Sequence, residues 1–250
     1  MNPYYADDLV TLYLGDCREV TEWLSADVLV TDPPYGRAWR QGDTATRRGW
    51  VSDAHPGIAN DHDTAARDSA LAAWGTKPSL VFGDFLLSPP VDAKQVLIYD
   101  KGTSAGFTGA LGGFRRNAEA VYLMGAGWTS GLGGRSCVLT TRVSTGGNLA
   151  RRYGHPHAKP VDVMETLIAA CPPGVIADPF AGSGSTFVAA RNQGRRAIGV
   201  EIDERYAERA ARRLAQGVLE AMRSPLPAPV PVTGAAPAGR ENPRRPECAS

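Results

Sequence analysis

The sequence has almost no net charge and no long apolar run. Its 250 residues hold 27 Lys and Arg against 26 Asp and Glu, so any surface for nucleic acid must be local. No apolar stretch approaches the roughly 20 residues that cross a bilayer, and the start Met1-Asn-Pro-Tyr-Tyr5 lacks a signal-peptide pattern. We therefore expect a soluble, cytoplasmic protein with no membrane partner.

The sequence also lacks paired cysteines and clustered metal ligands. No CxxC pair occurs, and the four histidines do not group. This spacing favours free thiols in a reducing compartment over a disulfide framework, and it predicts no metal site. The four separated cysteines are Cys17, Cys137, Cys171 and Cys248.

A glycine loop between a strand and a helix is the most informative stretch. The apolar run Val175–Ala177 predicts a buried strand, and Asp178-Pro179 ends it. Gly182 and Gly184 follow, and Ser185 or Thr186 is expected to cap a helix that runs to Ala190. Open α/β sheets use this arrangement to bring backbone close to a nucleotide-like ligand.

A second strand, Arg196–Val200, ends on Glu201, where such folds place the carboxylate that binds ribose hydroxyls. The glycine loop has neither Gly-Lys-Ser/Thr nor a full GxGxxG, so a phosphate-bearing ligand is not required. A dinucleotide ligand, as in a dehydrogenase, remains an alternative.

A second polar motif follows another predicted strand. Asp27–Thr31 contains the continuous apolar run Val28–Val30, as in a buried parallel strand, and it leads into Asp32-Pro33-Pro34-Tyr35. The prolines end the strand, because they donate no amide hydrogen to a sheet. Asp32 and Tyr35 are thus expected at the carboxyl edge of the sheet, where open α/β folds bind ligands.

Further strands are predicted at 10–14, 79–82, 95–99 and 120–124, and helices at 63–74 and around 163–168. Val20, Trp23 and Leu24 have helical spacing within 17–24, and helical character fades beyond Arg213. We expect one catalytic domain over residues 1–218, and a Pro-, Ala- and Arg-rich disordered tail over 219–250.

Two long stretches without hydrophobic periodicity carry arginines. A loop this long inside a compact domain is usually functional or disordered. The first, 37–62, interleaves its arginines with Trp39 and Trp50; the second, 125–152, is rich in glycine. Arginines that alternate with aromatic side chains favour contact with nucleic-acid phosphates, and ordinary solvated charge is the alternative. The arginines of the two stretches are Arg37, Arg40, Arg47, Arg48, Arg135, Arg142, Arg151 and Arg152.

Four motifs occur in an order that carries a resemblance. They are Thr31-Asp-Pro-Pro-Tyr35, His155-Pro-x-x-Lys-Pro160, Asp178-Pro-Phe-Ala-Gly-Ser-Gly184 and Gly199-Val-Glu-Ile-Asp203. Between Leu12 and Leu214 the chain resembles a small, phage-like S-adenosylmethionine-dependent DNA amino-methyltransferase of the β arrangement. The resemblance implies an α/β fold: one doubly wound, mostly parallel, seven-stranded Rossmann-like sheet in circularly permuted order.

The resemblance also assigns roles to residues. It implies that Asp32, Pro33, Pro34 and Tyr35 act on an amino nitrogen of a base flipped out of the duplex. It places Asp178, Phe180, Gly182, Ser183 and Gly184 at the methionine end of S-adenosylmethionine, Glu201 at the ribose, Asp16 near the adenine and Lys159 beside the methionine. Asp16 as a turn residue and Glu201 as a surface carboxylate stay as alternatives, and His155 is interpreted as structural.

The implied substrate is double-stranded DNA, methylated at adenine N6, as in site-specific restriction-modification enzymes. Cytosine N4 remains the alternative, because both amino groups share one mechanism. An RNA or protein amide methyltransferase, or a cofactor-binding protein without activity, is a weaker alternative. The sequence leaves a homodimer open.

Overall fold

One mixed sheet forms the centre of the molecule, which is described here from a computed structural model. The structure describes residues 1–38, 57–103, 105, 110–130, 133–143 and 157–223. Nine strands pair in the order β1-β2-β9-β8-β3-β4-β6-β5-β7. Their bounds are β1 Tyr5–Ala6, β2 Val10–Leu14, β3 Val28–Thr31, β4 Ser79–Gly83, β5 Gln95–Asp100, β6 Ala118–Met124, β7 Val138–Thr140, β8 Ile176–Asp178 and β9 Ala197–Glu201.

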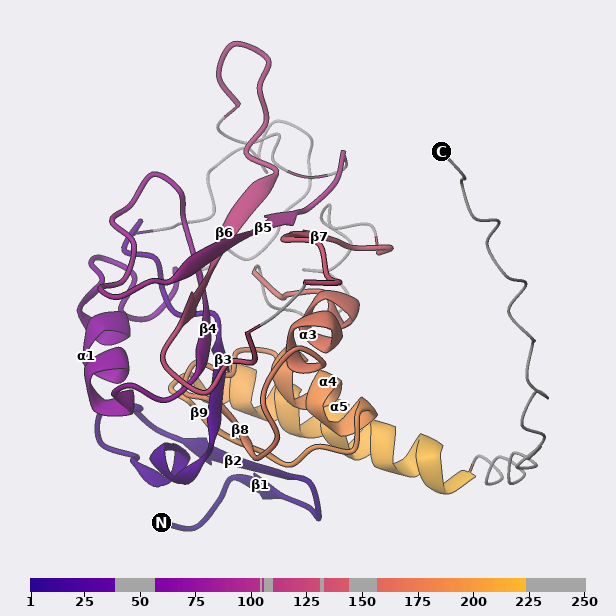
Figure 1. The fold of residues 1–250 in the computed structure, drawn as a ribbon. Helices are drawn as coiled ribbons and strands as arrows, with labels where there is room; N and C mark the ends of the chain where they lie inside the picture. The colour runs from indigo at the N-terminus through magenta and orange to yellow at the C-terminus, as the bar shows by residue number, and fades with distance from the viewer. Residues whose placement is uncertain (39–56, 104, 106–109, 131–132, 144–156, 224–250) are drawn as a thin grey trace, which may run out of the picture.

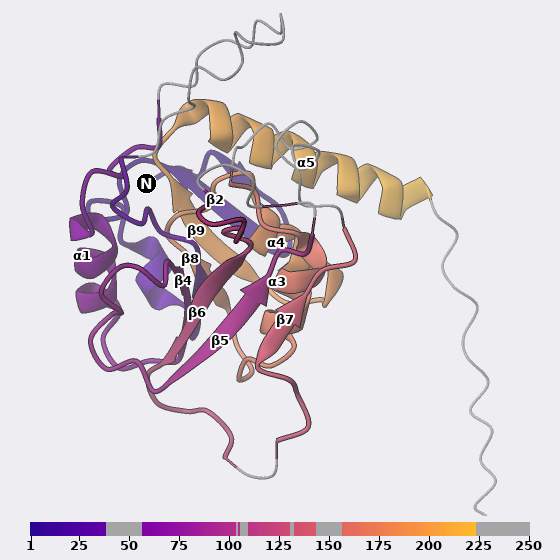
Figure 2. The same ribbon diagram turned by 90° about the horizontal axis from the view of Figure 1, so that it is seen from above.

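Helices cover both faces of the sheet, so the doubly wound prediction is confirmed (Figures 1 and 2). On one side lie α1 and a single 3₁₀ turn, η1; on the other lie α3, α4 and α5. The bounds are η1 Glu22–Ser25, α1 Ala65–Trp74, α3 Val161–Ile168, α4 Ser185–Asn192 and α5 Glu204–Arg223.

Successive side chains of a strand point to opposite faces of the sheet, so the sheet has one apolar core on each face. In β3, Val28 and Val30 pack toward α3, α4 and α5, whereas Leu29 packs with Trp23 and Trp74 on the opposite face. The side chains of Val28, Leu29 and Val30 are all fully buried, as expected for a parallel strand covered on both sides.

Several local predictions were wrong. The sheet has nine strands rather than seven, because the short β1 and β7 add to its edges. Residues 17–24 do not form a full helix; only the turn η1 forms. Helix α5 does not fade at Arg213 but continues to Arg223, so the expected domain boundary at 218 falls inside it. Residues 224–250, most of the expected tail, lie outside the described residues.

Parallel pairing determines where the loops that follow the strands meet. Strands β2, β9, β8, β3 and β4 run in the same direction, so their carboxyl ends share one edge. Strand β6 is antiparallel to β4 and begins at this edge, and β5, antiparallel to β6, ends there. Seven strands therefore deliver residues to one site.

Gly199 is needed where β9 crosses close to β8. A Cβ at this position would stand 2.0 Å from the Asp178 carbonyl oxygen and 2.8 Å from Phe187 Cζ. We predict that Gly199→Ala lowers the free energy of unfolding by about 3 kcal/mol through overpacking, measured by urea denaturation. Gly133→Ala is the control, because a Cβ there meets nothing within 4 Å. Equal stabilities for the two variants would contradict this packing account.

Candidate active site

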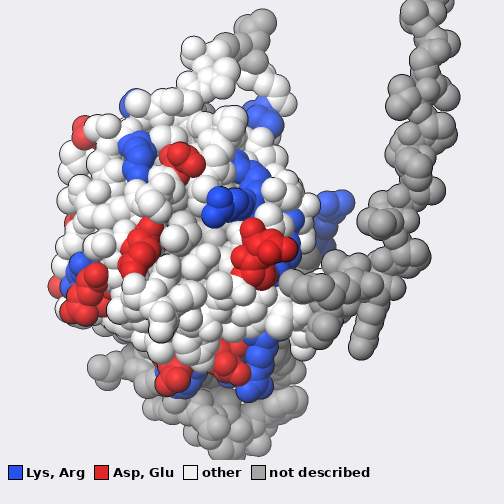
Figure 3. All heavy atoms as spheres, turned by 90° about the horizontal axis from the view of Figure 1, so that it is seen from below, with Lys and Arg blue, Asp and Glu red and all other residues white. Residues whose placement is uncertain are grey.

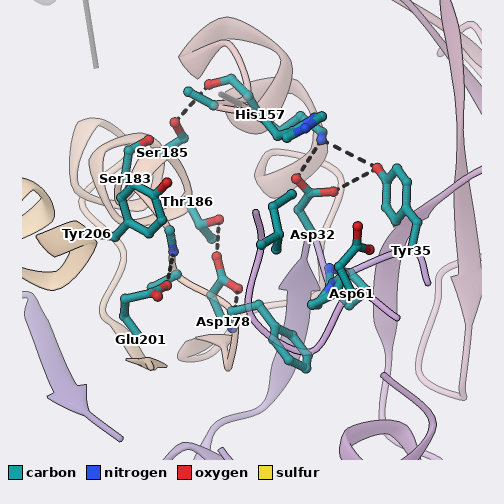
Figure 4. A pocket seen from close by; sticks show the side chains of 18 of the residues that line it. Asp32, Tyr35, Asp61, His157, Asp178, Ser183, Ser185, Thr186, Glu201 and Tyr206 are labelled. Atoms are coloured by element: carbon teal, nitrogen blue, oxygen red, sulfur yellow. Dashed lines mark hydrogen bonds and ion pairs between the residues drawn. The ribbon is translucent and has the colours of Figure 1, made fainter. Parts of the chain in front are cut away.

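Four acidic residues stand along the carboxyl edge of the sheet in the order of their strands. Asp16 follows β2, Glu201 ends β9, Asp178 ends β8 and Asp32 follows β3. All four line one cavity of about 580 Å³. Figure 4 shows Glu201 and Tyr206 at one side of this cavity, Asp32 and Tyr35 at the other, and Asp178 between them.

Glu201 holds the glycine loop in place through its carboxylate. One oxygen, Oε2, accepts from the Gly182 amide at 2.7 Å, and Oε1 accepts from the Asp203 amide at 2.9 Å. Gly182 has φ +52°, a left-handed conformation that favours glycine. Burial raises the pKa of Glu201 to about 7, although the two amides oppose the shift.

Asp178 is also buried, between two threonines from different elements. Thr31 Oγ1 donates to Oδ1 at 2.7 Å and Thr186 Oγ1 donates to Oδ2 at 2.5 Å, while the Phe180 amide donates to Oδ1 at 3.1 Å. Burial raises the pKa of Asp178 to about 6 against these hydrogen bonds. The carboxylate thereby ties β3, β8 and α4 together beneath the cavity.

The expected side-chain cap of α4 was wrong. Gly184, at φ +78°, occupies the N-cap position, and no side chain caps the helix. The hydroxyls of Ser185 and Thr186 bond elsewhere: Ser185 Oγ donates to the Lys159 carbonyl oxygen at 2.8 Å, and Thr186 bonds Asp178. The two hydroxyls therefore join the glycine loop to the segment before α3.

Asp32 lies in a buried ionic group at the other end of the cavity. Tyr35 OH donates to its Oδ1 at 2.8 Å, and Lys159 Nζ donates to its Oδ2 at 2.5 Å. Burial raises the pKa of Asp32, and this outweighs the opposing effect of the Lys159 ammonium. Burial alone would lower the pKa of Lys159. The carboxylates of Asp32 and Glu119 outweigh this effect, so the pKa of Lys159 is raised and its ammonium stays charged.

Two further members of this group come from strands with no recognised motif. Glu119 in β6 pairs with Lys159 Nζ at 3.2 Å and with Lys101 Nζ, just after β5, at 2.7 Å. Burial alone would raise the pKa of Glu119, but the two lysines lower it to about 2. The sequence analysis missed both residues. The available signal was a lone glutamate in an otherwise apolar strand.

The remaining predicted site residues line the same cavity, except Gly184, which does not reach it. Asp16 forms an ion pair with Arg18 and accepts from the Arg18 amide at 2.9 Å. Phe180 and Ser183 belong to the glycine loop, and Pro33 and Pro34 to the loop after β3. Within the described residues, no group of three or more His, Cys, Asp or Glu could hold a metal ion. In the same part of the chain, no helix is long and apolar enough to cross a membrane.

Only part of the two arginine-rich loops is described. Arg37 pairs with Asp84 at 2.5 Å, and buried Asp61 accepts from the Gly36 amide at 2.8 Å, so the start of the first loop is anchored. Arg135 donates to the Ala169 carbonyl at 3.1 Å. The calls on Arg40, Arg47, Arg48, Arg151, Arg152 and His155 lie outside the described residues.

Comparison with known proteins matches this chain to methyltransferases. The model of the family described as DNA methylase matches residues 128–212. The putative methylase YubD of Escherichia coli K12 is 28% identical over 223 residues, covering 80% of this chain and 88% of YubD. Alignments with curated type II methyltransferases span 21%, 24% and 23% of those proteins.

Two solved structures share the fold. The PvuII cytosine-N4-specific DNA methyltransferase superposes with TM-score 0.59 at 15% identity, over 84% of this chain and 87% of that one. The complex of M1.HpyAVI with S-adenosylmethionine superposes with TM-score 0.53 at 18% identity, over 82% of this chain and 100% of that one. At identities this low, the superpositions show that this chain shares the α/β fold of these two proteins, and they show no finer property.

The raised pKa of Glu201 makes stability depend on pH. The folded state holds this proton more tightly than the unfolded chain, whose Glu titrates near 4.5. Wild-type stability relative to Glu201→Gln should therefore fall as pH rises from about 4.5 to about 7, by on the order of 3 kcal/mol. Urea denaturation of both proteins at several pH values measures the difference. A constant difference across this window would contradict the burial argument.

Proposed function

We propose that this chain is a DNA amino-methyltransferase, which transfers a methyl group from S-adenosylmethionine to the amino group of adenine N6 or cytosine N4 in double-stranded DNA. The similarity of residues 128–212 to the DNA methylase family and of 80% of the chain to YubD supports this proposal. The observation that carries the proposal is one cavity with two unlike ends. An acceptor carboxylate, Asp32, lies at one end, and a carboxylate-supported glycine loop lies at the other.

The acceptor end suits a weakly nucleophilic amino group. The nitrogen lone pair of adenine or cytosine is delocalised into the ring. In this proposal the Asp32 carboxylate and the Pro33 carbonyl accept the two amino hydrogens, which frees the lone pair for in-line attack on the methyl carbon. The nitrogen–carbon bond would form as the carbon–sulfur bond breaks and leaves S-adenosylhomocysteine, and the positive charge that develops on the nitrogen would be stabilised by the carboxylate already in place. The proton that the methylated nitrogen then loses would pass to the Asp32 carboxylate.

The other end suits the cofactor. Glu201 lines the cavity and would accept from the ribose hydroxyls, and Gly182 and Ser183 line it where the methionine part would lie. Gly184 holds the left-handed turn of the same loop at φ +78° and does not itself line the cavity. Asp178 and Phe180 complete this side, and Asp16 lies near the adenine. S-adenosylmethionine supplies the methyl group as a sulfonium, whose sulfur is a ready leaving group. We place the enzyme in the cytoplasm, where both S-adenosylmethionine and DNA would be present.

Adenine N6 is the proposed target. The support is Asp32 at the first position of the Asp-Pro-Pro-Tyr motif, with cytosine N4 as the second candidate on the same chemistry. On the face in Figure 3, acidic and basic side chains are interspersed among larger uncharged areas. We place the DNA contacts in the arginine-bearing loops near 37–62 and 125–152, and Arg37 at the start of the first loop lines the cavity.

Methyl transfer can be tested with labelled cofactor. Purified protein is incubated with methyl-labelled S-adenosylmethionine and duplex DNA, RNA or protein, and the digested products are separated by mass spectrometry. We expect label in N6-methyladenine from DNA. Label in N4-methylcytosine would move the assignment to the second candidate, and label only in RNA or protein would contradict the DNA substrate.

Asp32→Ala should abolish methyl transfer, by at least about 100-fold in kcat, because the amino nitrogen loses its charged acceptor. Cofactor affinity should stay within a few fold, since Asp32 acts on the base. Calorimetry and initial rates measure the two effects. Asp8→Ala, an exposed carboxylate before β2, is the matched control. Near wild-type turnover of the Asp32 variant would remove this residue from the mechanism.

Gly182→Val should weaken cofactor binding by about ten-fold or more, because a β-branched side chain is strained at φ +52° beside the cavity. Gly194→Val is the control for strain alone: its φ is +65°, and a Cβ there meets nothing within 4 Å. Calorimetry on both folded variants decides the outcome. Equal affinities would show that the glycine loop does not approach the cofactor.

A further inference from the structure

The Lys159 ammonium lies between two carboxylates: Asp32, which follows β3 and is partly exposed, and Glu119, which is buried in β6. Its Nζ is 2.5 Å from Asp32 Oδ2 and 3.2 Å from Glu119 Oε2. Lys159 is 7% exposed and Glu119 is 8% exposed, so neither charge is solvated. A buried ammonium that loses a carboxylate partner needs another one close by, because an unpaired buried charge is strongly destabilising.

The proposed reaction makes a conflicting demand on Asp32. One of its oxygens already accepts from Tyr35 OH at 2.8 Å, and the other is the closest partner of Lys159. An ammonium at this distance offsets the negative charge of the Asp32 carboxylate. The neutral amino group of the base needs that charge on its acceptor, because hydrogen bonds to a charged acceptor are stronger. Asp32 can thus become a strong acceptor for the target base only as its ion pair with Lys159 weakens.

Glu119 has the position and the charge to take over that ion pair. Its Oε1 pairs with Lys101 Nζ at 2.7 Å, and its Oε2 lies 3.2 Å from Lys159 Nζ and 3.4 Å from the Tyr35 hydroxyl. Lysine has a flexible four-carbon stem, so a small displacement of Nζ exchanges one carboxylate for the other. The cluster of Asp32, Glu119, Lys101 and Lys159 holds two charges of each sign, so it stays neutral during the exchange.

We propose that Glu119 is a positioning residue: it receives the Lys159 ammonium when Asp32 accepts the amino group of the target base. This inference rests on the proposed function, because it gives Asp32 that acceptor role. The Glu119 carboxylate itself touches neither the base nor the cofactor in this scheme. It acts through Lys159.

The inference makes a prediction about the titration of Asp32. Glu119 is a like charge that raises the pKa of Asp32, and it also draws the ammonium away. Without the charge of Glu119, Lys159 pairs with Asp32 alone, and both changes lower the pKa of Asp32. The other charged or titratable groups around Asp32 are Tyr35, Tyr99, Lys101, His157 and Asp178, and Glu119→Gln leaves all of them in place.

The test compares wild type with Glu119→Gln, which keeps the shape of the side chain and removes its charge. We expect kcat/KM for duplex DNA to fall about ten-fold while cofactor affinity stays within about two-fold. The acid limb of the kcat/KM profile should move to lower pH by about one unit. Glu119→Asp should return the limb toward its wild-type position, and Glu208→Gln, on exposed α5 surface, is the control.

A second readout does not require activity. Carbon-13 NMR titration of the Asp32 carboxyl, assigned with Asp32→Asn, should show a lower pKa in Glu119→Gln than in wild type. If Glu119→Gln does not fold, the Glu119→Gln/Lys101→Met variant keeps the cluster neutral and should give the same result. An unchanged or higher Asp32 pKa would overturn the inference, as would lost activity with an unmoved acid limb. If wild type methylates no DNA, the proposed function fails, and the NMR titration still decides the role of Glu119.

Discussion

The parallel pairing of β2, β9, β8 and β3 is the constraint on which the site depends. Each of these strands ends in an acidic residue or is followed by one within two positions, and parallel pairing brings the four carboxyl ends to one edge. The antiparallel β6 and β5 add a glutamate and a lysine at that edge. Acidic groups far apart in the sequence thus line one cavity, in the order of their strands.

Three carboxylates along this edge are stabilised by different donors of this chain: Asp178 and Glu201, which are buried, and Asp32, which is partly exposed. Asp178 accepts from two threonine hydroxyls, Glu201 from two backbone amides, and Asp32 from a tyrosine and an ammonium. These partners match three tasks: Asp178 joins elements, Glu201 shapes the glycine loop, and Asp32 pairs with the buried Lys159 ammonium. Burial raises the pKa of all three carboxyls, and shifted pKa values of this kind are common at functional sites.

Sequence reasoning found the strands and motifs of this edge because proline and glycine mark where apolar strands stop. It placed Asp32, Asp178 and Glu201 at strand ends, and the structure brings them together. It missed Glu119, because no local pattern tells which strand lies beside β4 or in which direction it runs. It also expected Ser185 or Thr186 to cap a helix. In the structure the Ser185 hydroxyl bonds to the Lys159 carbonyl and the Thr186 hydroxyl bonds to Asp178, and both partners lie outside α4. Such pairings are set by sheet topology, which local periodicity does not encode.

The central claim is that one cavity holds the methyl donor at the Glu201 end with its sulfur facing Asp32. A crystal structure of the protein with S-adenosylhomocysteine tests this claim most directly. The account predicts ribose hydroxyls that donate to the Glu201 carboxylate, homocysteine against the 178–184 loop, and a sulfur directed at the space beside Asp32 and Pro33. A ligand bound outside this cavity, or bound within it with the sulfur directed away from Asp32, would contradict the account.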